Sequence, residues 1–132
     1  MIALDTNVLV RYLVQDHPEQ AAIATRIIED ELTPSEPGFL SLVVLVELSW
    51  VLDRIYRCPA RQVANIIAEL LASPTLLVEQ SGVVAAAIAR PEGELADNLL
   101  HEVGKAHGCA QTVTFDRRFA RLPGVELAGE RA

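Results

Sequence analysis

Four acidic residues stand next to segments whose patterns predict strand ends or apolar helices. Asp5 follows the apolar run of residues 1–4, Glu47 lies within the apolar run of residues 39–52, Asp97 opens a helical pattern, and Asp116 follows residues 111–114. Two carboxylates about 4 Å apart repel by roughly 4 kcal/mol at an effective dielectric near 20, and a bound divalent cation removes that penalty. All-oxygen ligation suits Mg²⁺ or Mn²⁺ better than Zn²⁺. The four acids together therefore predict a Mg²⁺ or Mn²⁺ site.

Each of these acids also has an ordinary structural interpretation. Asp5 suits a helix N-cap, Asp97 suits the first turn of a helix, and Asp116 suits a turn after a strand. Glu47 is the most informative acid, because its helical neighbours are almost all apolar and glutamate is seldom buried without a partner. Its alternative position is the rim of a narrow polar stripe with Ser49. The combination is stronger than any single residue, because all four acids border one predicted pocket.

Other polar residues adjoin the same predicted pocket. Thr114 stands two residues before Asp116, so both side chains would face one side of a strand. Arg117 and Arg118 form a small basic group beside it, which is either a solvated turn or a phosphate contact. Glu94, one turn before Asp97, is a candidate outer acid of the site.

Short apolar segments alternate with helical patterns along the chain. We expect strands at residues 1–4, 39–41, 75–78, 111–114 and 125–127, and helices at 8–14, 19–31, 42–56, 60–72, 81–90 and 94–107. Pro59 suits a helix N1 position, Ser81 an N-cap, and Gly108 the residue after a helix. This alternation predicts a parallel sheet covered on both faces, with ligands outside the carboxyl ends of its strands.

The composition fits one globular domain over residues 1–132. The chain is 51% hydrophobic, and we expect neither a membrane span nor a signal peptide. Cys58 and Cys109 form no disulfide framework and are expected to be buried, reduced thiols in the cytoplasm. The histidines lack HExxH spacing and are expected at the surface: His17, His101 and His107. The apolar face of residues 63–70 is expected to be core, with a dimer interface as the alternative.

The net charge of −7 argues against nucleic-acid binding, because phosphate contacts need a positive surface. Cations bound by clustered acids can offset this charge and attract phosphate. An acidic surface also suits a basic protein partner. The sequence contains no GxGxxG or GxxxxGK[ST] phosphate loop and no GxSxG nucleophile turn.

Several ordered motifs resemble those of PIN-domain ribonucleases, especially VapC-type toxins. They are LDTNVLVRYL at residues 4–13, VEL at 46–48 followed by WVL at 50–52, LADNLL at 95–100, TVTFDRRF at 112–119 and LPGV at 122–125. Each motif alone is loose, but the ordered set covers nearly the whole chain. One departure is Glu94, where relatives often have aspartate.

The resemblance implies a three-layer α/β/α fold with a central parallel sheet and a Mg²⁺- or Mn²⁺-dependent endoribonuclease. By position, Asp5, Glu47, Asp97 and Asp116 match the family's four acids. Asp5 and Asp97 would bind the metal directly, Asp116 would bind it directly or through water, and Glu47 would complete the metal site. The polar residues around the family's pocket are matched by Thr6, Asn7 and Thr114. The resemblance also implies a homodimer held inactive by an antitoxin protein.

The chemistry expected from this resemblance is metal-assisted hydrolysis of RNA by water, with Glu47 helping to take the proton. One alternative is a PIN-like module that binds a partner protein without catalysis, which the charge of −7 favours and the four intact acids oppose. A second is another metal-dependent phosphotransferase or phosphohydrolase. That enzyme would want an Asp-x-Asp pair after the first strand, where this chain has Asn7.

Overall fold

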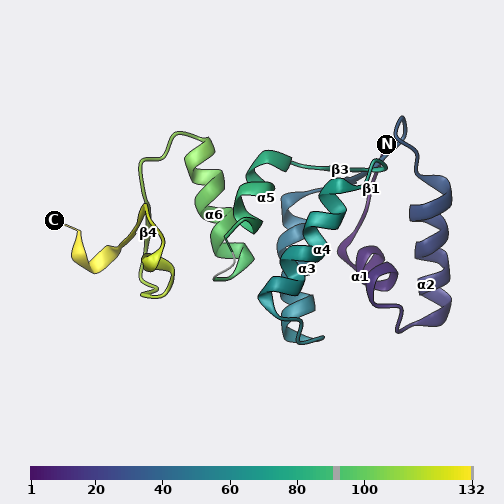
Figure 1. The fold of residues 1–132 in the computed structure, drawn as a ribbon, viewed down its shortest axis with the longest axis horizontal. Coiled ribbons are helices and arrows are strands. Elements are labelled where there is room, and N and C mark those ends of the chain that lie inside the picture. Colours follow the sequence, from purple (N-terminus) through teal and green to yellow (C-terminus); the bar gives the residue numbers. More distant parts are fainter. Residues whose placement is uncertain (91–92, 132) are drawn as a thin grey trace.

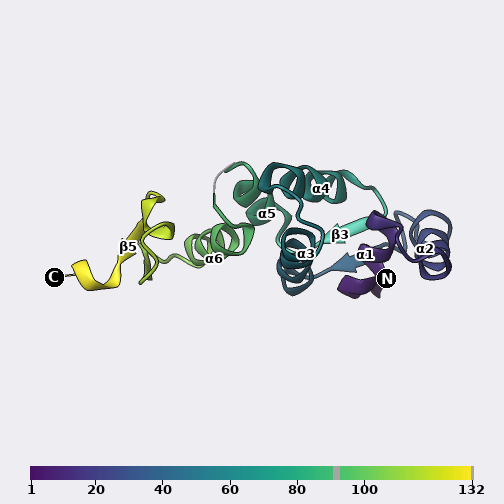
Figure 2. The same cartoon turned by 90° about the horizontal axis from the view of Figure 1, so that it is seen from below.

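The computed structural model describes residues 1–90 and 93–131 and shows an elongated molecule. Figures 1 and 2 show the N-terminal strands and most helices at one end, and the C-terminal strands β4 and β5 at the other. Helix α6 lies between these two parts in both views.

The strands form two separate parallel sheets. Strands β1 (Ile2–Ala3), β2 (Gly38–Leu40) and β3 (Leu76–Val78) pair in the order β1-β2-β3. Strands β4 (Thr112–Thr114) and β5 (Val125–Leu127) pair only with each other among the described residues. The predicted parallel strands are thus confirmed, but they do not join into one sheet here.

In the part of the chain that the structure describes, seven helical segments connect the strands, close to the predicted positions. They are α1 (Thr6–Val14), α2 (Pro18–Thr25) with its π-helical extension η1 (Arg26–Glu31), α3 (Leu42–Arg54), α4 (Ala60–Ala72), α5 (Ser81–Ile88) and α6 (Leu95–Ala106). Two 3₁₀ turns follow in the C-terminal part, η2 (Phe119–Arg121) and η3 (Ala128–Glu130). The α/β fold class expected from the sequence is confirmed.

Some predicted helix ends were wrong by one or two residues. Helix α1 begins at Thr6, because Asp5 caps it and accepts a hydrogen bond from the Thr6 N–H. Pro59 is the N-cap of α4 and not its first residue. Ser81 is the first residue of α5, behind an N-cap at Gln80 in the left-handed conformation. The positive φ of +87° at Gly108 agrees with its predicted place just after α6.

The core lies on one face of the three-stranded sheet. Side chains alternate between the faces along a strand, and Leu4, Leu40 and Val78 on one face are all buried. They pack with the fully buried leucines of α3 and with apolar residues of the other helices. On the opposite face, Ala3 is exposed and Leu77 is 49% exposed. The helical cover predicted for both faces is therefore thin on this second face.

Helix α6 is fixed to both of its neighbours. Arg90, just after α5, donates to Glu102 of α6 at 2.9 Å. His101 is only 2% exposed, and its Nδ1 lies 2.7 Å from Thr112 Oγ1 of β4. The expectation that His101 lies at the surface was wrong, because α6 turns this side chain toward β4. A Cβ added to Gly124 would lie 3.1 Å from the His101 ring, so only glycine fits there without a shift.

Cys109 is exposed and Cys58 is half-buried, so the prediction of two buried thiols was wrong. Both cysteines follow the ends of helices, where the chain lies near the surface. Val63, Ile67 and Leu70 of α4 lie in the core, as expected. Among the described residues, no helix is long and apolar enough to cross a membrane.

Truncating a leucine of α3 should destabilise the fold strongly. Leu48 has no exposed surface, so Leu48→Ala leaves a cavity and should lower the free energy of unfolding by about 2–5 kcal/mol. Val43 on the same helix is 67% exposed, so Val43→Ala is the matched control and should change it by less than about 0.5 kcal/mol. Urea unfolding followed by circular dichroism measures both. Equal losses would contradict the assignment of the core to this face of α3.

Candidate functional site

The first part of the candidate site lies at the carboxyl end of β1. Asp5 is exposed and follows the strand, and its Oδ1 accepts a hydrogen bond from the backbone N–H of Thr6 at 2.7 Å. Thr6 is buried, and its Oγ1 donates to Glu47 Oε1 of α3 at 3.1 Å. One threonine therefore joins two acids that are far apart in the sequence.

Glu47 is exposed, which differs from the buried position favoured by its apolar neighbours. It stands on the outer side of α3 with Val43, which is 67% exposed, and Trp50, which is 41% exposed. Ser49, the other polar residue of the expected stripe, is buried and donates to the Val46 carbonyl at 2.7 Å. Glu47 is therefore accessible from solvent. Its neighbours on this side of α3 are apolar but are themselves exposed.

The second part of the site joins α6 to β4. Asp97 is half-buried in the first turn of α6, and burial raises the pKa of its carboxyl. The negative charges of Glu94 and Asp116 raise the pKa of Asp97 further. Asp97 and Asp116 are thus close enough for their charges to interact, and Glu94 is a third acid beside them.

Asp116 is held firmly by the turn after β4. Its Oδ1 accepts hydrogen bonds from the backbone N–H groups of Arg118 at 2.8 Å and Phe119 at 3.2 Å. The N–H of Asp116 donates to Thr114 Oγ1 at 3.0 Å. The Thr114 hydroxyl therefore positions Asp116 by accepting from its backbone N–H. This agrees with the expectation that Thr114 supports the acidic site.

The structure does not gather the four acids at one place. Asp5 and Glu47 adjoin the three-stranded sheet, whereas Asp97 and Asp116 lie where α6 meets the second sheet. In residues 1–90 and 93–131, no group of three or more histidines, cysteines or acids is close enough to hold a metal ion. Each part by itself is only half of the carboxylate set expected from the sequence.

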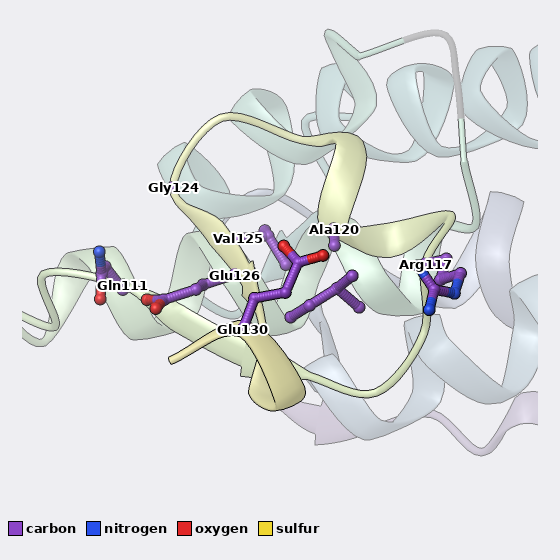
Figure 3. A pocket seen from close by; sticks show the side chains of 8 residues that line it. Gln111, Arg117, Ala120, Gly124, Val125, Glu126 and Glu130 are labelled. Atoms are coloured by element: carbon purple, nitrogen blue, oxygen red, sulfur yellow. The ribbon is translucent and has the colours of Figure 1, made fainter. Parts of the chain in front are cut away.

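Two of the other predicted polar residues, Asn7 and Arg117, line separate hollows. Asn7 lies in a groove of about 190 Å³ between α1 and α2, together with Arg11 and Ile23. Arg117 lines a larger hollow of about 430 Å³ on the second sheet, shown in Figure 3 with Glu126 and Glu130. These two glutamates make that hollow a poor phosphate site, because their charges repel an anion.

Helix α6 carries buried polar residues whose burial was not expected from the sequence. Asn98 is 2% exposed and its Nδ2 lies 3.5 Å from the Ala87 carbonyl of α5. Glu102, 8% exposed, pairs with Arg90, and His101 contacts β4. In the sequence, only their position on the same helix as Asp97 could have indicated that these residues matter for the site. They determine where that helix, and hence Asp97, stands relative to the rest of the chain.

Comparison with known proteins identifies the family. The model of the PIN domain family matches residues 2–125, which include all four acids. No curated protein and no solved structure matches the chain. PIN domains are generally nucleases, so a match over almost the whole length indicates a nuclease-type fold whose substrate is a nucleic acid. The chain belongs to the PIN domain family.

Proposed function

We propose that this PIN domain, spanning residues 1–132, is an endoribonuclease that uses Mg²⁺ or Mn²⁺ and acts as the toxin of a toxin–antitoxin pair. The observation that carries the proposal is the hydrogen bond between Thr6 and Glu47 beside Asp5, at the carboxyl end of β1. In α/β proteins with parallel strands, this end is where ligands bind. The family supports nuclease chemistry, and the choice of RNA rests on the sequence resemblance.

The oxygen donors present fit a hard divalent cation. Asp5 and Glu47 supply one pair of carboxylates, and Asp97 and Asp116 supply the other. Burial, and after it the charges of Glu94 and Asp116, raise the pKa of Asp97, and a cation beside these carboxylates would favour the ionised form. Such a cation would stabilise the charge that develops during phosphodiester hydrolysis.

The chain's own residues then have separate roles. Asp5, Asp97 and Asp116 would hold the cation once the two pairs of acids are brought together, while the buried hydroxyl of Thr6 orients the Glu47 carboxylate. Glu47 is exposed and can receive the proton of an attacking water at its carboxylate. Arg117 and Arg118 are exposed next to Asp116 and can approach the RNA backbone from that side.

We further propose an antitoxin partner, a homodimer and a cytoplasmic location, as the resemblance to VapC-type toxins implies. The net charge of −7 favours a basic protein partner. The groove between α1 and α2 is lined by Asn7, two residues after Asp5, and by the exposed side chain of Ile23. An antitoxin segment could bind there through apolar contacts, next to the site.

A catalytically inactive binding module is the second candidate. It is favoured by the separation of the acids into two pairs within the described residues. A binding module would hold a partner protein equally well after Asp5 or Asp97 is replaced. The nuclease would lose its activity with either replacement, so the variants below discriminate the two functions.

Removing one acid should abolish RNA cleavage without unfolding the protein. Asp5→Asn keeps an acceptor for the Thr6 N–H but removes a negative ligand, so we expect cleavage to fall at least about 100-fold. Asp53→Asn, an exposed acid further along α3, is the control and should cleave like the wild type. Sequencing of new 5′-phosphate RNA ends, with Mg²⁺ or Mn²⁺ and with EDTA, measures the effect. Wild-type protein with no metal-dependent cleavage of any tested RNA would favour the binding module.

Replacing Asp97 should stabilise the metal-free protein at neutral pH. The pKa of Asp97 is raised in the fold, so its ionised form costs stability, and this cost grows as the pH rises through the pKa of the folded state. Asp97→Asn should therefore raise the Tm slightly at pH 7 with EDTA, and the gain should vanish at acidic pH.

Thermal denaturation across pH 3–8 provides this test, and Mg²⁺ should then stabilise the wild type more than the Asp97→Asn variant. A lower Tm for the variant at pH 7 with EDTA would contradict the repulsion assigned to Asp97, Glu94 and Asp116.

A further inference from the structure

Strands β1 and β4 each have an open edge among the described residues. Among the described residues, β1 pairs only with β2, and β4 pairs only with β5. An open edge presents backbone donors and acceptors that can pair with another strand. Both edge strands carry exposed apolar side chains, since Ile2 is 49% exposed and Val113 is 46% exposed. Phe115, directly after β4, is 87% exposed.

The carboxyl ends of these two strands carry the separated acids. Asp5 stands two residues beyond Ala3, the last residue of β1, and Asp116 stands two residues beyond Thr114, the last residue of β4. Parallel pairing of Ala3 with Thr114 therefore sets Asp5 beside Asp116. The outer edge of β3 offers no such match, because Gln80 stands at the equivalent position.

The faces of the two sheets are complementary in this register. Ile2 and Leu4 lie on the core face of the three-stranded sheet. Pairing Ala3 with Thr114 sets Val113 beside Ile2 and Phe115 beside Leu4, on this same face. The opposite face of β4 carries Thr112, which α6 covers through His101.

Ala3, Phe39 and Leu77 lie side by side on the thinly covered face of the three-stranded sheet. After the proposed pairing, α6 would lie on this same face. Helices would then stand on both faces.

The exposed area is large enough for such an interface. The chain exposes 7928 Å², whereas a compact monomer of 14.4 kDa exposes about 6,800 Å². The excess of roughly 1,100 Å² exceeds the roughly 800 Å² that each partner contributes to a standard protein interface.

The contacts of α6 favour a second copy over the chain's own β1. Arg90 and Glu102 hold α6 to α5, and His101 holds β4 to α6. Figure 1 shows that this arrangement places β4 at the end of the molecule remote from β1. To reach its own β1, β4 would have to break one of these contacts, whereas the β1 edge of another copy is open without any such cost.

We propose that two copies of this chain exchange their C-terminal strands, so that β4 of each copy pairs with β1 of the other. The exchange is reciprocal and closes with two-fold symmetry. Each four-carboxylate site then combines Asp5 and Glu47 of one copy with Asp97 and Asp116 of the other. The catalytic part of this inference rests on the proposed function, whereas the strand exchange itself does not.

Cross-linking tests the strand exchange without reference to activity. A chain with Ile2→Cys and Val113→Cys, in which Cys58 and Cys109 are serine, is treated with a short bifunctional thiol reagent. The proposed register sets these positions side by side on two copies, so we expect a covalent dimer on a denaturing gel. An internally cross-linked monomer, or no cross-link, would overturn the proposal.

The matched control pairs Val113→Cys with Leu77→Cys. Leu77 is exposed to the same extent as Ile2, but it lies on β3 and on the opposite face. The covalent dimer should be a minor product with this pair. Equal yields from both pairs would show random collision and count against the exchange. Light scattering of the uncross-linked wild type should give twice the mass of the chain, and a monomeric mass would contradict the proposal.

Complementation tests the shared site. Chains carrying Asp5→Asn and Asp116→Asn are co-expressed with different affinity tags, and the mixed dimer is purified through both. Exchange leaves one intact site of two, so the mixed dimer should have about half of the wild-type RNA cleavage, while each variant alone is inactive. An inactive mixed dimer from an active wild type would overturn the shared site. A cross-linked dimer of an inactive wild type would instead refute the proposed function and keep the exchange.

Discussion

The position of α6 is the constraint on which the rest of this structure depends. The pair between Arg90 and Glu102 fixes the helix to α5, and the contact between His101 and Thr112 fixes β4 to the helix. Asp97 lies in the first turn of α6 and Asp116 follows β4 by two residues, so the position of α6 determines where both acids lie. Because these polar groups are largely buried, separating them would leave unpaired donors and acceptors, which is costly.

The two halves of the site differ in how they are organised. At β1, the site is preorganised by a buried hydroxyl, since Thr6 links Asp5 to Glu47 through its backbone and side chain. At α6, burial and the negative charges of Glu94 and Asp116 raise the pKa of Asp97. In the proposed exchanged dimer, a divalent cation would supply the counter-charge that the acids at α6 lack.

Parallel strands explain why the site depends on how the sheets meet. Carboxyl ends of neighbouring parallel strands lie at one edge, so acids that follow such strands meet only when the strands are adjacent. Here β1 and β4 are both edge strands among the described residues, and their acids are apart. In the proposed strand exchange, sheet pairing and assembly of the carboxylate cluster are therefore one event.

The sequence by itself determined the elements, the α/β class and the candidate acids, because periodicity, capping residues and turn residues act over a few neighbouring positions. It also indicated the right segments for the core, such as the apolar face of α4.

Only the tertiary structure decided that Glu47 is exposed, that His101 is buried against β4, and that the strands form two sheets. These features depend on contacts between residues distant in the chain. An apolar helix pattern does not say which of its sides meets a neighbour, and a strand pattern does not name its partner.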